Sequence, residues 1–374
     1  MLHFSISHAD TTSEARTGRL TLAHGEVITP AFMPVGTNAT VKAIELCSLA
    51  QMNIRLILSN AYHLYLRPGM EIIRSVGGLH KFMDWKHNIL TDSGGFQLFS
   101  LAPFCKIEEQ GVFFRSHIDG SAHRLSPEDV VRIQIELGSD ILMPLDVCTG
   151  TEISEDRAQE ALITTTAWAV RSKQRMAQAA EHHYGSLFGI VQGNFFKHLR
   201  KRSAEELCAL DFDGYAIGGL SVGEAPGLFN EYLAFCAALL PKEKPRYLMG
   251  IGTPEYILQA IGEGIDLFDC VFPTRTARNA LLFTRQGPIN IRNERYKADL
   301  SPVDSECACS TCKNHSRAYL RHLFKCKEIL APMLATRHNL FFIRELIESA
   351  HTAIKENAFL EFKRDFLERY REIS

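Results

Sequence analysis

The sequence lacks every feature of a membrane or secreted protein. No apolar run approaches the roughly 20 residues that a helix needs to cross a bilayer. The N-terminus, MLHFSISHADTTSEA, has no basic segment followed by an apolar core, so we expect no signal peptide. Low-complexity segments are also absent. These absences predict a cytoplasmic globular protein.

The chain also has little net charge. A formal charge of −2 over 374 residues gives no overall indication of nucleic-acid binding. The distribution is more informative, because residues 275–340 contain twelve Lys and Arg against five Asp and Glu. This segment carries +7 and the remainder of the chain −9. One basic region on a slightly acidic body predicts a localised contact with a polyanion.

Disulfide bonds are not expected, because they are rare in the cytosol. The ten cysteines are therefore thiols or metal ligands. Cys307, Cys309 and Cys312 lie within six residues, which favours a metal site over packing. A closed tetrahedral zinc site needs a fourth ligand. We favour His338, with His315 and Cys326 as alternatives, and expect a structural Zn²⁺ because no open coordination position is evident.

Predicted strands and helices alternate along most of the chain, which is typical of a parallel sheet. Seven or eight such units, in a chain of this length, predict an α/β fold: a (β/α)8 TIM barrel preceded by short antiparallel strands. The pattern changes beyond Ile291, where the cysteine cluster lies in a polar segment. We therefore assign residues 1–290 to the catalytic barrel and 291–374 to a zinc-binding, C-terminal helical subdomain that completes it.

Some elements are predicted with definite bounds. Residues 186–191 and 214–217 are predicted strands, and Ser126 is the predicted cap of a helix that ends at Leu137. Asp119-Gly120 predicts the turn of a hairpin, and a further helix is predicted at residues 340–349.

Polar residues recur at the C-terminal ends of the predicted strands, which is where barrel enzymes build their sites. Positions on five different strands share this placement: Asp92, Asp146, Gln192, Gly218-Gly219 and Asp269. Repetition on so many strands predicts that these residues form one site.

Asp269 stands in an apolar strand that leads into Arg275 and Arg278. Burying a carboxylate costs several kcal/mol unless a partner or a function compensates. We interpret Asp269 as a catalytic carboxylate beside an anionic substrate; the alternative is an ion pair with one of the two arginines. Asp92 precedes two glycines that allow a close approach of the backbone to a ligand, so it reads a base edge, moves a proton or simply forms a turn.

A purine edge requires both hydrogen-bond donors and acceptors. Asp146, Gln192 and the backbone amides of Gly218-Gly219 supply them on neighbouring strands. Phe96 and Met249 are candidates to enclose a flat ring, although both residue types more often belong to a core. We therefore predict a pocket that recognises a nucleobase.

Seven motifs in this order resemble the tRNA-guanine transglycosylase family over roughly residues 10–345. They are TDSGGFQ (91–97), LDVCT (145–149), VQG (191–193), GGLSVGE (218–224), YLMGIG (247–252), FDCVFPTR (268–275) and CXCXXC (307–312). The resemblance implies that Asp269 attacks C1′ of the first anticodon nucleotide and expels guanine, with Asp92 as general acid and base. Two carboxylates are also what exchange with retention requires in retaining glycosidases.

The resemblance also assigns the binding residues. It implies that Asp146 and Gln192 read the pyrimidine edge of the base and that Phe96 and Met249 stack on it. The remaining substrate contacts are Asp92, Cys148, Gly218, Gly219 and Leu220. Arg275 and Arg278 fall where the family contacts tRNA, and the zinc ligands are Cys307, Cys309, Cys312 and His338.

The implied partners are a tRNA with a GUN anticodon, a 7-deazaguanine base and a second copy of the chain in a homodimer, with one structural Zn²⁺ per subunit. The incoming base stays open. Cys148 and Val222 favour 7-aminomethyl-7-deazaguanine, whereas Gly150 and Thr151, in place of a Pro-Tyr pair, leave room for the larger queuine. Val147 and Thr253 replace a usual Glu and Lys. A non-catalytic RNA-binding paralogue is the alternative function; the presence of both Asp92 and Asp269 argues against it.

Overall fold

Eight parallel strands form the centre of the computed structural model, which describes residues 2–101, 104–179 and 183–370. They are β4 (Ala31–Pro34), β5 (Leu56–Asn60), β6 (Asn88–Asp92), β10 (Ile141–Leu142), β11 (Ser186–Val191), β12 (Gly214–Ile217), β13 (Arg246–Leu248) and β14 (Leu267–Cys270). Their order is β4-β14-β13-β12-β11-β10-β6-β5. A single bridge between Val35 and Leu58 joins the two edge strands, so the barrel is nearly closed, as predicted.

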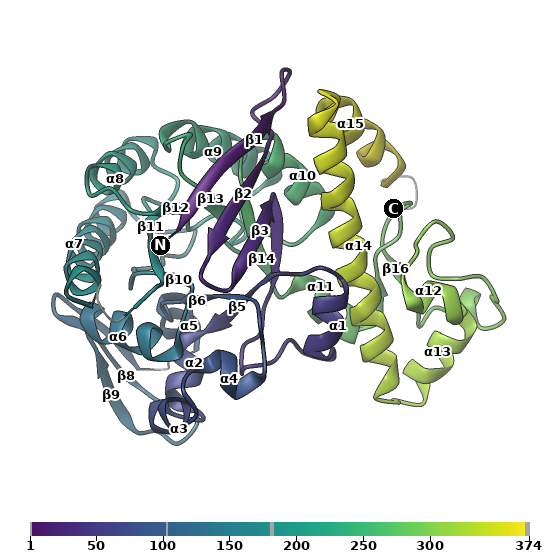
Figure 1. The fold of residues 1–374 in the computed structure, drawn as a ribbon, viewed down its shortest axis with the longest axis horizontal. Coiled ribbons are helices and arrows are strands. Elements are labelled where there is room, and N and C mark those ends of the chain that lie inside the picture. Colours follow the sequence, from purple (N-terminus) through teal and green to yellow (C-terminus); the bar gives the residue numbers. More distant parts are fainter. Residues whose placement is uncertain (1, 102–103, 180–182, 371–374) are drawn as a thin grey trace.

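Helices follow the strands and surround this barrel (Figure 1). They are α1 (Leu46–Gln51), α2 (Ala61–Leu66), α3 (Met70–Val76), α4 (Leu79–Met83), α5 (Gly95–Leu101), α6 (Pro127–Leu137), α7 (Glu155–Ala179), α8 (Lys197–Ala209), α9 (Pro226–Leu239), α10 (Pro254–Gly262) and α11 (Phe272–Arg278). Local sequence explains α6 well, because Ser126 and Asp129 form a capping box and Pro127 occupies the first turn. The sequence predicted this helix start and the end at Leu137.

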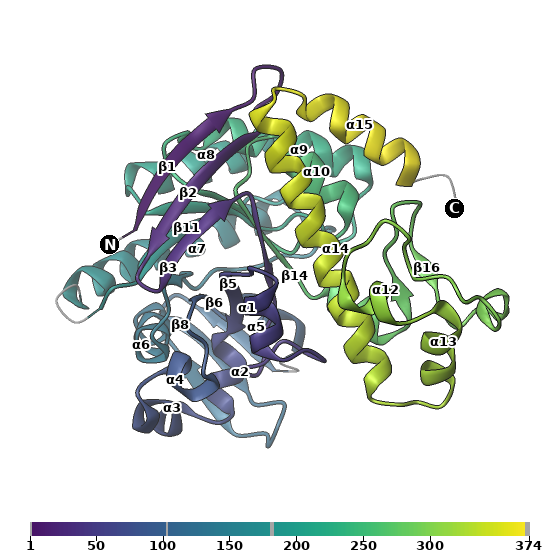
Figure 2. The same cartoon turned by 45° about the vertical axis from the view of Figure 1, so that its right-hand side comes forward.

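A small antiparallel sheet covers the N-terminal end of the barrel (Figure 2). It consists of β1 (His3–Ala9), β2 (Arg16–Leu22) and β3 (Gly25–Thr29). Leu20, Leu22 and Val27 belong to the same buried cluster as the inward-facing residues of the barrel strands. The sheet therefore closes this end of the barrel and leaves the C-terminal ends of the strands for a site.

A second antiparallel sheet is inserted between β6 and α6. It contains β7 (Cys105–Glu108), β8 (Gly111–Arg115) and β9 (Ala122–Leu125). The sequence indicated the hairpin of β8 and β9 around Asp119-Gly120 but not β7, because β7 is short and its burial does not alternate.

The C-terminal part forms a lobe beside the barrel and then returns to it (Figure 2). The lobe contains β15 (Leu281–Leu282), β16 (Ile289–Asn290), the 3-10 helix η1 (Glu294–Tyr296), α12 (Ser310–Asn314) and α13 (Arg317–Lys325). The long helix α14 (Leu330–Lys355) and then α15 (Phe359–Tyr370) follow. Leu334 of α14 belongs to the core of the lobe, whereas Ile343 and Ile347 belong to that of the barrel. The subdomain boundary at residue 290 stays a prediction.

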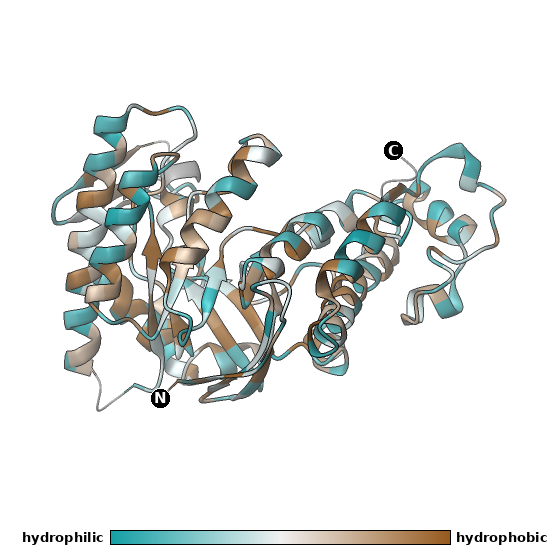
Figure 3. Cartoon of the chain, turned by 90° about the horizontal axis from the view of Figure 1, so that it is seen from above, coloured by the Kyte–Doolittle hydropathy of each residue, from teal (hydrophilic) through white to brown (hydrophobic). Residues whose placement is uncertain are grey.

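The helices present apolar faces to the sheet and hydrophilic faces outward (Figure 3). No helix in the described part of the chain has the length and hydropathy of a membrane span.

Candidate active site

Asp269 lies near the C-terminal end of β14 and is half-buried. Its Oδ1 accepts a hydrogen bond of 2.6 Å from the Tyr247 hydroxyl and one of 2.9 Å from the Gly250 N–H. Burial raises the pKa of Asp269, and these two hydrogen bonds oppose the rise by stabilising the carboxylate. The two donors fix the orientation of one oxygen, and neither of them is a charged group.

Asp266 is the other carboxylate of this apolar stretch, and its burial is explained by an ion pair. It is fully buried just before β14, at the opposite end of the barrel, and its Oδ1 accepts a hydrogen bond of 3.0 Å from Arg16 Nε. Within the described residues, neither Arg275 nor Arg278 forms an ion pair with any carboxylate. The structural ion pair therefore belongs to Asp266, and Asp269 is left without a cationic partner.

Asp92 ends β6 and lies beside the end of β5. Its Oδ1 accepts from the Ala61 N–H at 3.0 Å and its Oδ2 from Gln97 Nε2 at 2.9 Å and from Asn60 Nδ2. Burial raises the pKa of Asp92 to about 6, and the charge of Asp269 adds to the rise. A carboxyl group with this pKa can give and take a proton near neutral pH.

Asp146 and Gln192 lie beyond the C-terminal ends of the neighbouring strands β10 and β11, and their side chains are in contact. Gln192 Nε2 donates to Asp146 Oδ2 at 2.8 Å, and Ser93 Oγ donates to Asp146 Oδ1 at 3.4 Å. Burial raises the pKa of Asp146, and the amide of Gln192 opposes this. A Cβ atom at Gly218 would lie 2.7 Å from Gln192 Nε2, which explains the glycine there. These residues thus form a cluster of donors and acceptors next to Asp92.

The other predicted pocket residues differ in exposure. Phe96 on α5 is 55% exposed, Met249 is half-buried and Leu220 is buried in the barrel core. Cys148 is half-buried, and burial together with the charge of Asp146 raises the pKa of its thiol to about 12, so it stays protonated. The stacking role of Phe96 and Met249 and the role of Cys148 stay predictions.

Several residues of this region were not assigned a role from the sequence. Asn60 and Gln97 hold Asp92, and Tyr247 holds Asp269. Arg200 of α8 donates to the carbonyl oxygens of Gly218 and Gly219 at 2.7 and 3.1 Å. Asn60 stands at the end of a predicted strand, so its position could have indicated a place in the site. Arg200 lies in a helix, and nothing in its sequence position indicates a role.

Cys307, Cys309, Cys312 and His338 form a buried cluster whose candidate ligand atoms all lie within 4.8 Å of one another. His338 Nδ1 lies 3.8, 3.4 and 3.3 Å from the three sulfur atoms in that order. His338 Nε2 lies 2.6 Å from the Phe283 carbonyl oxygen, which fixes the tautomer with Nδ1 free to bind a metal. Three thiolates and one imidazole with this spacing fit a metal ion.

A second group of His24, His80 and Asp140 lies where the N-terminal sheet meets the barrel. Its imidazole rings stack with centroids 3.7 Å apart and planes inclined by only 20°. A metal must lie near the plane of each imidazole that binds it, and two stacked, nearly parallel planes share no such point. This group is therefore a hydrogen-bonded cluster around Asp140 and not a metal site.

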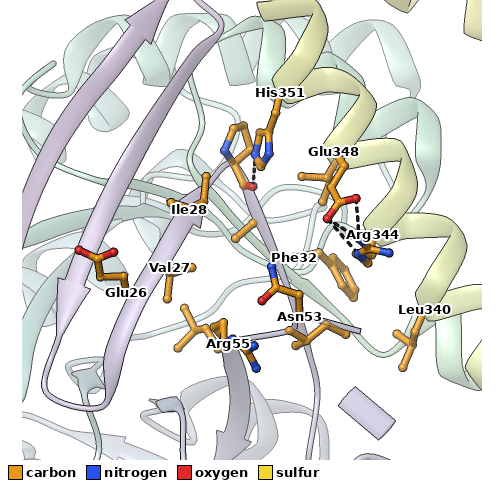
Figure 4. Close-up of a pocket in the computed structure, with 15 residues that line it drawn as sticks. Glu26, Val27, Ile28, Phe32, Asn53, Arg55, Leu340, Arg344, Glu348 and His351 are labelled. Atoms are coloured by element: carbon orange, nitrogen blue, oxygen red, sulfur yellow. Dashed lines mark hydrogen bonds and ion pairs between the residues drawn. The ribbon is translucent and has the colours of Figure 1, made fainter. Parts of the chain in front are cut away.

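A cavity of about 340 Å³ lies between the first residues of β4 and β5 and helix α14 (Figure 4). Its charged side chains already have partners: Arg344 pairs with Glu348, and His351 Nε2 lies 2.8 Å from the Pro30 carbonyl oxygen. It opens at the N-terminal ends of the strands, away from Asp92 and Asp269, so we do not assign the active site to it.

Removing one thiolate tests the metal cluster. We expect Cys309→Ser to lower the metal content from about one equivalent to near zero and to lower the melting temperature, because the binding energy of a structural metal contributes to folding. Elemental analysis and thermal unfolding measure both. Cys326→Ser is the control, since Cys326 is exposed and its thiol lies near His322 instead. Unchanged metal content in Cys309→Ser would contradict the assignment.

The fold and the strand-end side chains define a class. The protein is a TIM-barrel enzyme with three carboxyl groups at the C-terminal strand ends, those of Asp92, Asp146 and Asp269, and a separate buried Cys3His cluster.

Comparison with known proteins identifies the family within that class. A family model described as queuine tRNA-ribosyltransferase matches residues 10–372. Proteins named queuine tRNA-ribosyltransferase from Caldanaerobacter subterraneus subsp. tengcongensis and Pelotomaculum thermopropionicum are each 52% identical, over 99% and 98% of this chain and 98% of their own length. The protein of that name from Treponema denticola is 50% identical over 98% of this chain and 97% of its own. The chain belongs to the queuine tRNA-ribosyltransferase family.

Proposed function

We propose that the protein is a tRNA-guanine transglycosylase that replaces guanine at the wobble position of tRNAs with GUN anticodons by a 7-deazaguanine. Family membership supports the reaction class. The observation that carries the proposal for this chain is the pair Asp269 and Asp92, which lie at the C-terminal ends of β14 and β6 in one barrel, together with Asp146 and Gln192.

In this mechanism Asp269 is the nucleophile. Its carboxylate attacks C1′ of the target ribose, the C1′–N9 bond breaks, and the bonding electrons leave with guanine. The second oxygen of Asp269 is the attacking atom, because Oδ1 is held by Tyr247 and Gly250. The ribosyl ester that forms keeps C1′ activated while the bases change.

Asp92 is the general acid and then the general base. It gives a proton to the departing guanine and takes the N9 proton of the incoming base, which then displaces Asp269 from C1′. Its pKa of about 6 suits both steps. The hydrogen bonds from Asn60, Ala61 and Gln97 hold the carboxylate until the base arrives.

Asp146 and Gln192 read the edge of the base that guanine and 7-deazaguanines share. Their mutual hydrogen bond keeps the Gln192 amide in one orientation in the free protein. The 7-substituent must be read elsewhere, by residues near Cys148 and Gly150. The 7-aminomethyl base remains our first choice. The ratio of kcat/KM for that base and for queuine, measured with one tRNA, decides between them.

Arg275 and Arg278 of α11 are the proposed tRNA contacts. Arg275 is exposed, and Arg278 Nη1 is buried without a hydrogen-bond partner among the described residues. We expect Arg275→Ala to weaken tRNA binding and to reduce the slope of log Kd against log salt by about 1, because each phosphate contact releases a counterion. Fluorescence titrations at several salt concentrations measure the slope. Arg364→Ala, which removes a cation already paired with Asp365, should leave it unchanged; an unchanged slope in Arg275→Ala as well would remove Arg275 from the interface.

The metal of the Cys3His cluster is proposed to be Zn²⁺, which takes such ligand sets in closed structural sites. It would hold the lobe that carries the basic segment. A homodimer is proposed from the family resemblance. A tRNA substrate and ten unpaired cysteines favour the cytoplasm.

Incorporation of radiolabelled guanine into tRNA tests the proposed function. We expect label to enter GUN-anticodon tRNA and not a tRNA with another wobble base. Binding of tRNA without incorporation would instead support the non-catalytic paralogue.

A further inference from the structure

Arg200 is a buried cation without an anion. Its residue is 0% exposed, and no carboxylate of the described residues lies within ion-pair distance of it. Its guanidinium donates to four backbone carbonyl oxygens, those of Asn194 and Gly218 at 2.7 Å each, Gly219 at 3.1 Å and Val191 at 3.4 Å. A fully desolvated charge is costly to maintain, so this arrangement calls for a reason beyond simple packing.

The two carbonyl groups determine where the neighbouring N–H groups point. In a trans peptide the N–H and the C=O of one unit point in opposite directions. Because the carbonyl oxygens of Gly218 and Gly219 face Arg200, the N–H groups of Gly219 and Leu220 point away from it. Neither N–H donates to any other described residue of the protein.

Gly219 makes this arrangement possible. Its φ of +65° is a left-handed conformation that glycine adopts without strain. A Cβ atom there would lie 2.9 Å from Gln192 Oε1, so the peptide passes directly against the Gln192 amide. Successive N–H groups in such a turn form a concave donor site for an oxygen that carries negative charge.

Helix α8 also fixes the loop that carries Gln192. Arg200 Nε binds the Asn194 carbonyl oxygen, and Ser203 Oγ accepts from the Gln192 N–H at 3.1 Å. Two residues on one turn of α8 thus tie the β11 and β12 loops together, and both loops carry parts of the proposed base pocket.

We propose that Arg200 is a positioning residue of base exchange, which aims the N–H groups of Gly219 and Leu220 at the ring carbonyl oxygen of the base. This inference rests on the proposed function. When the glycosidic bond breaks, guanine leaves with the bonding electrons, and its ring carbonyl accepts part of the negative charge. Preorganised N–H donors backed by a buried cation stabilise that charge better than they stabilise neutral base.

Arg16 supplies a matched comparison, since it is 4% exposed and also donates to two backbone carbonyl groups. It differs in its carboxylate partner Asp266 and in its place at the other end of the barrel. A purely structural role for Arg200 predicts that lysine at either position has the same consequences.

The experiment compares wild type, Arg200→Lys, Arg200→Met and Arg16→Lys. Calorimetry with guanine and no tRNA gives Kd, exchange kinetics give kcat and both KM values, and thermal unfolding gives the melting temperature. We expect Arg200→Lys to raise the Kd and KM for guanine at least tenfold and to lower kcat, with the KM for tRNA within twofold of wild type. Arg200→Met, which also removes the charge, should show a larger effect. Arg16→Lys should lower the melting temperature but leave the Kd for guanine within twofold.

Two results would overturn the inference: an unchanged Kd for guanine in folded Arg200→Lys, or an increase in the Kd for guanine in Arg16→Lys that equals the increase in Arg200→Lys. If Arg200→Met does not fold, the Kd of Arg200→Lys alone tests the inference. A wild type that binds guanine but does not exchange it would contradict the proposed reaction alone, because Kd is measured without turnover.

Discussion

Asp269→Asn is expected to lower the rate of base exchange by about four orders of magnitude or more, the scale seen when a catalytic nucleophile is removed. The amide is nearly the same size as the carboxylate, and its oxygen can still accept the hydrogen bonds from Tyr247 and Gly250. The site should therefore keep its shape and lose its nucleophile. Labelled guanine incorporation measures the rate, and a covalent protein–RNA band on a denaturing gel should disappear while tRNA binding persists.

Asp266→Asn is the matched control on the same stretch of chain. It removes a buried carboxylate that pairs with Arg16 and does not face the site. We expect a lower melting temperature, because Arg16 is left without its anion. The protein that remains folded should still form the covalent protein–RNA band. Substantial turnover by Asp269→Asn, or a covalent band in it, would exclude Asp269 as the nucleophile.

Asp92→Asn is expected to have the second largest effect, a loss of about 10²- to 10⁴-fold, because general acid–base catalysis contributes on that scale. The defect should lie in proton transfer. Single-turnover formation of the covalent intermediate isolates the step in which guanine leaves, and this step requires the protonated acid.

The pH dependence of that step has a definite sign. Burial raises the pKa of Asp92 to about 6, so the group is protonated below that value and charged above it. The wild-type rate should fall as pH rises through about 6, and in Asp92→Asn this limb should be missing. A wild-type-like pH profile in the variant would remove Asp92 from the mechanism. Gln97→Ala, which removes one of the donors to Asp92, should shift the limb to higher pH.

The barrel fold could be predicted from the sequence because each βα unit is formed by residues that are close together in the chain. The apolar runs at 186–191 and 214–217 coincide with β11 and β12, and the cap at Ser126 marks the start of α6. Strand order needs no long-range information once parallel units are recognised. Helix α14 was underestimated as residues 340–349, because its first turns pack on the lobe and its last turns on the barrel, so no single apolar face runs along it.

The placement of the candidate site residues was predictable where a residue's position on a strand implied the direction of its side chain. Asp92, Asp146 and Asp269 follow this rule. The residues that donate hydrogen bonds to these carboxylates do not follow the rule, because they are distant in sequence. Tyr247 is 22 residues from Asp269, and Asn60 is 32 residues from Asp92. An aromatic residue inside a strand is indistinguishable from a core residue until the fold places its hydroxyl. Arg200 is the extreme case, because nothing in a helix of mixed charge indicates that one arginine turns inward.

The sheet β1–β3 covers the N-terminal end of the barrel, so the side chains at the C-terminal strand ends are reached from the other end. In the proposed reaction, guanine and the incoming base therefore use the same end of the barrel one after the other. The ribose stays tethered while the small molecules change places.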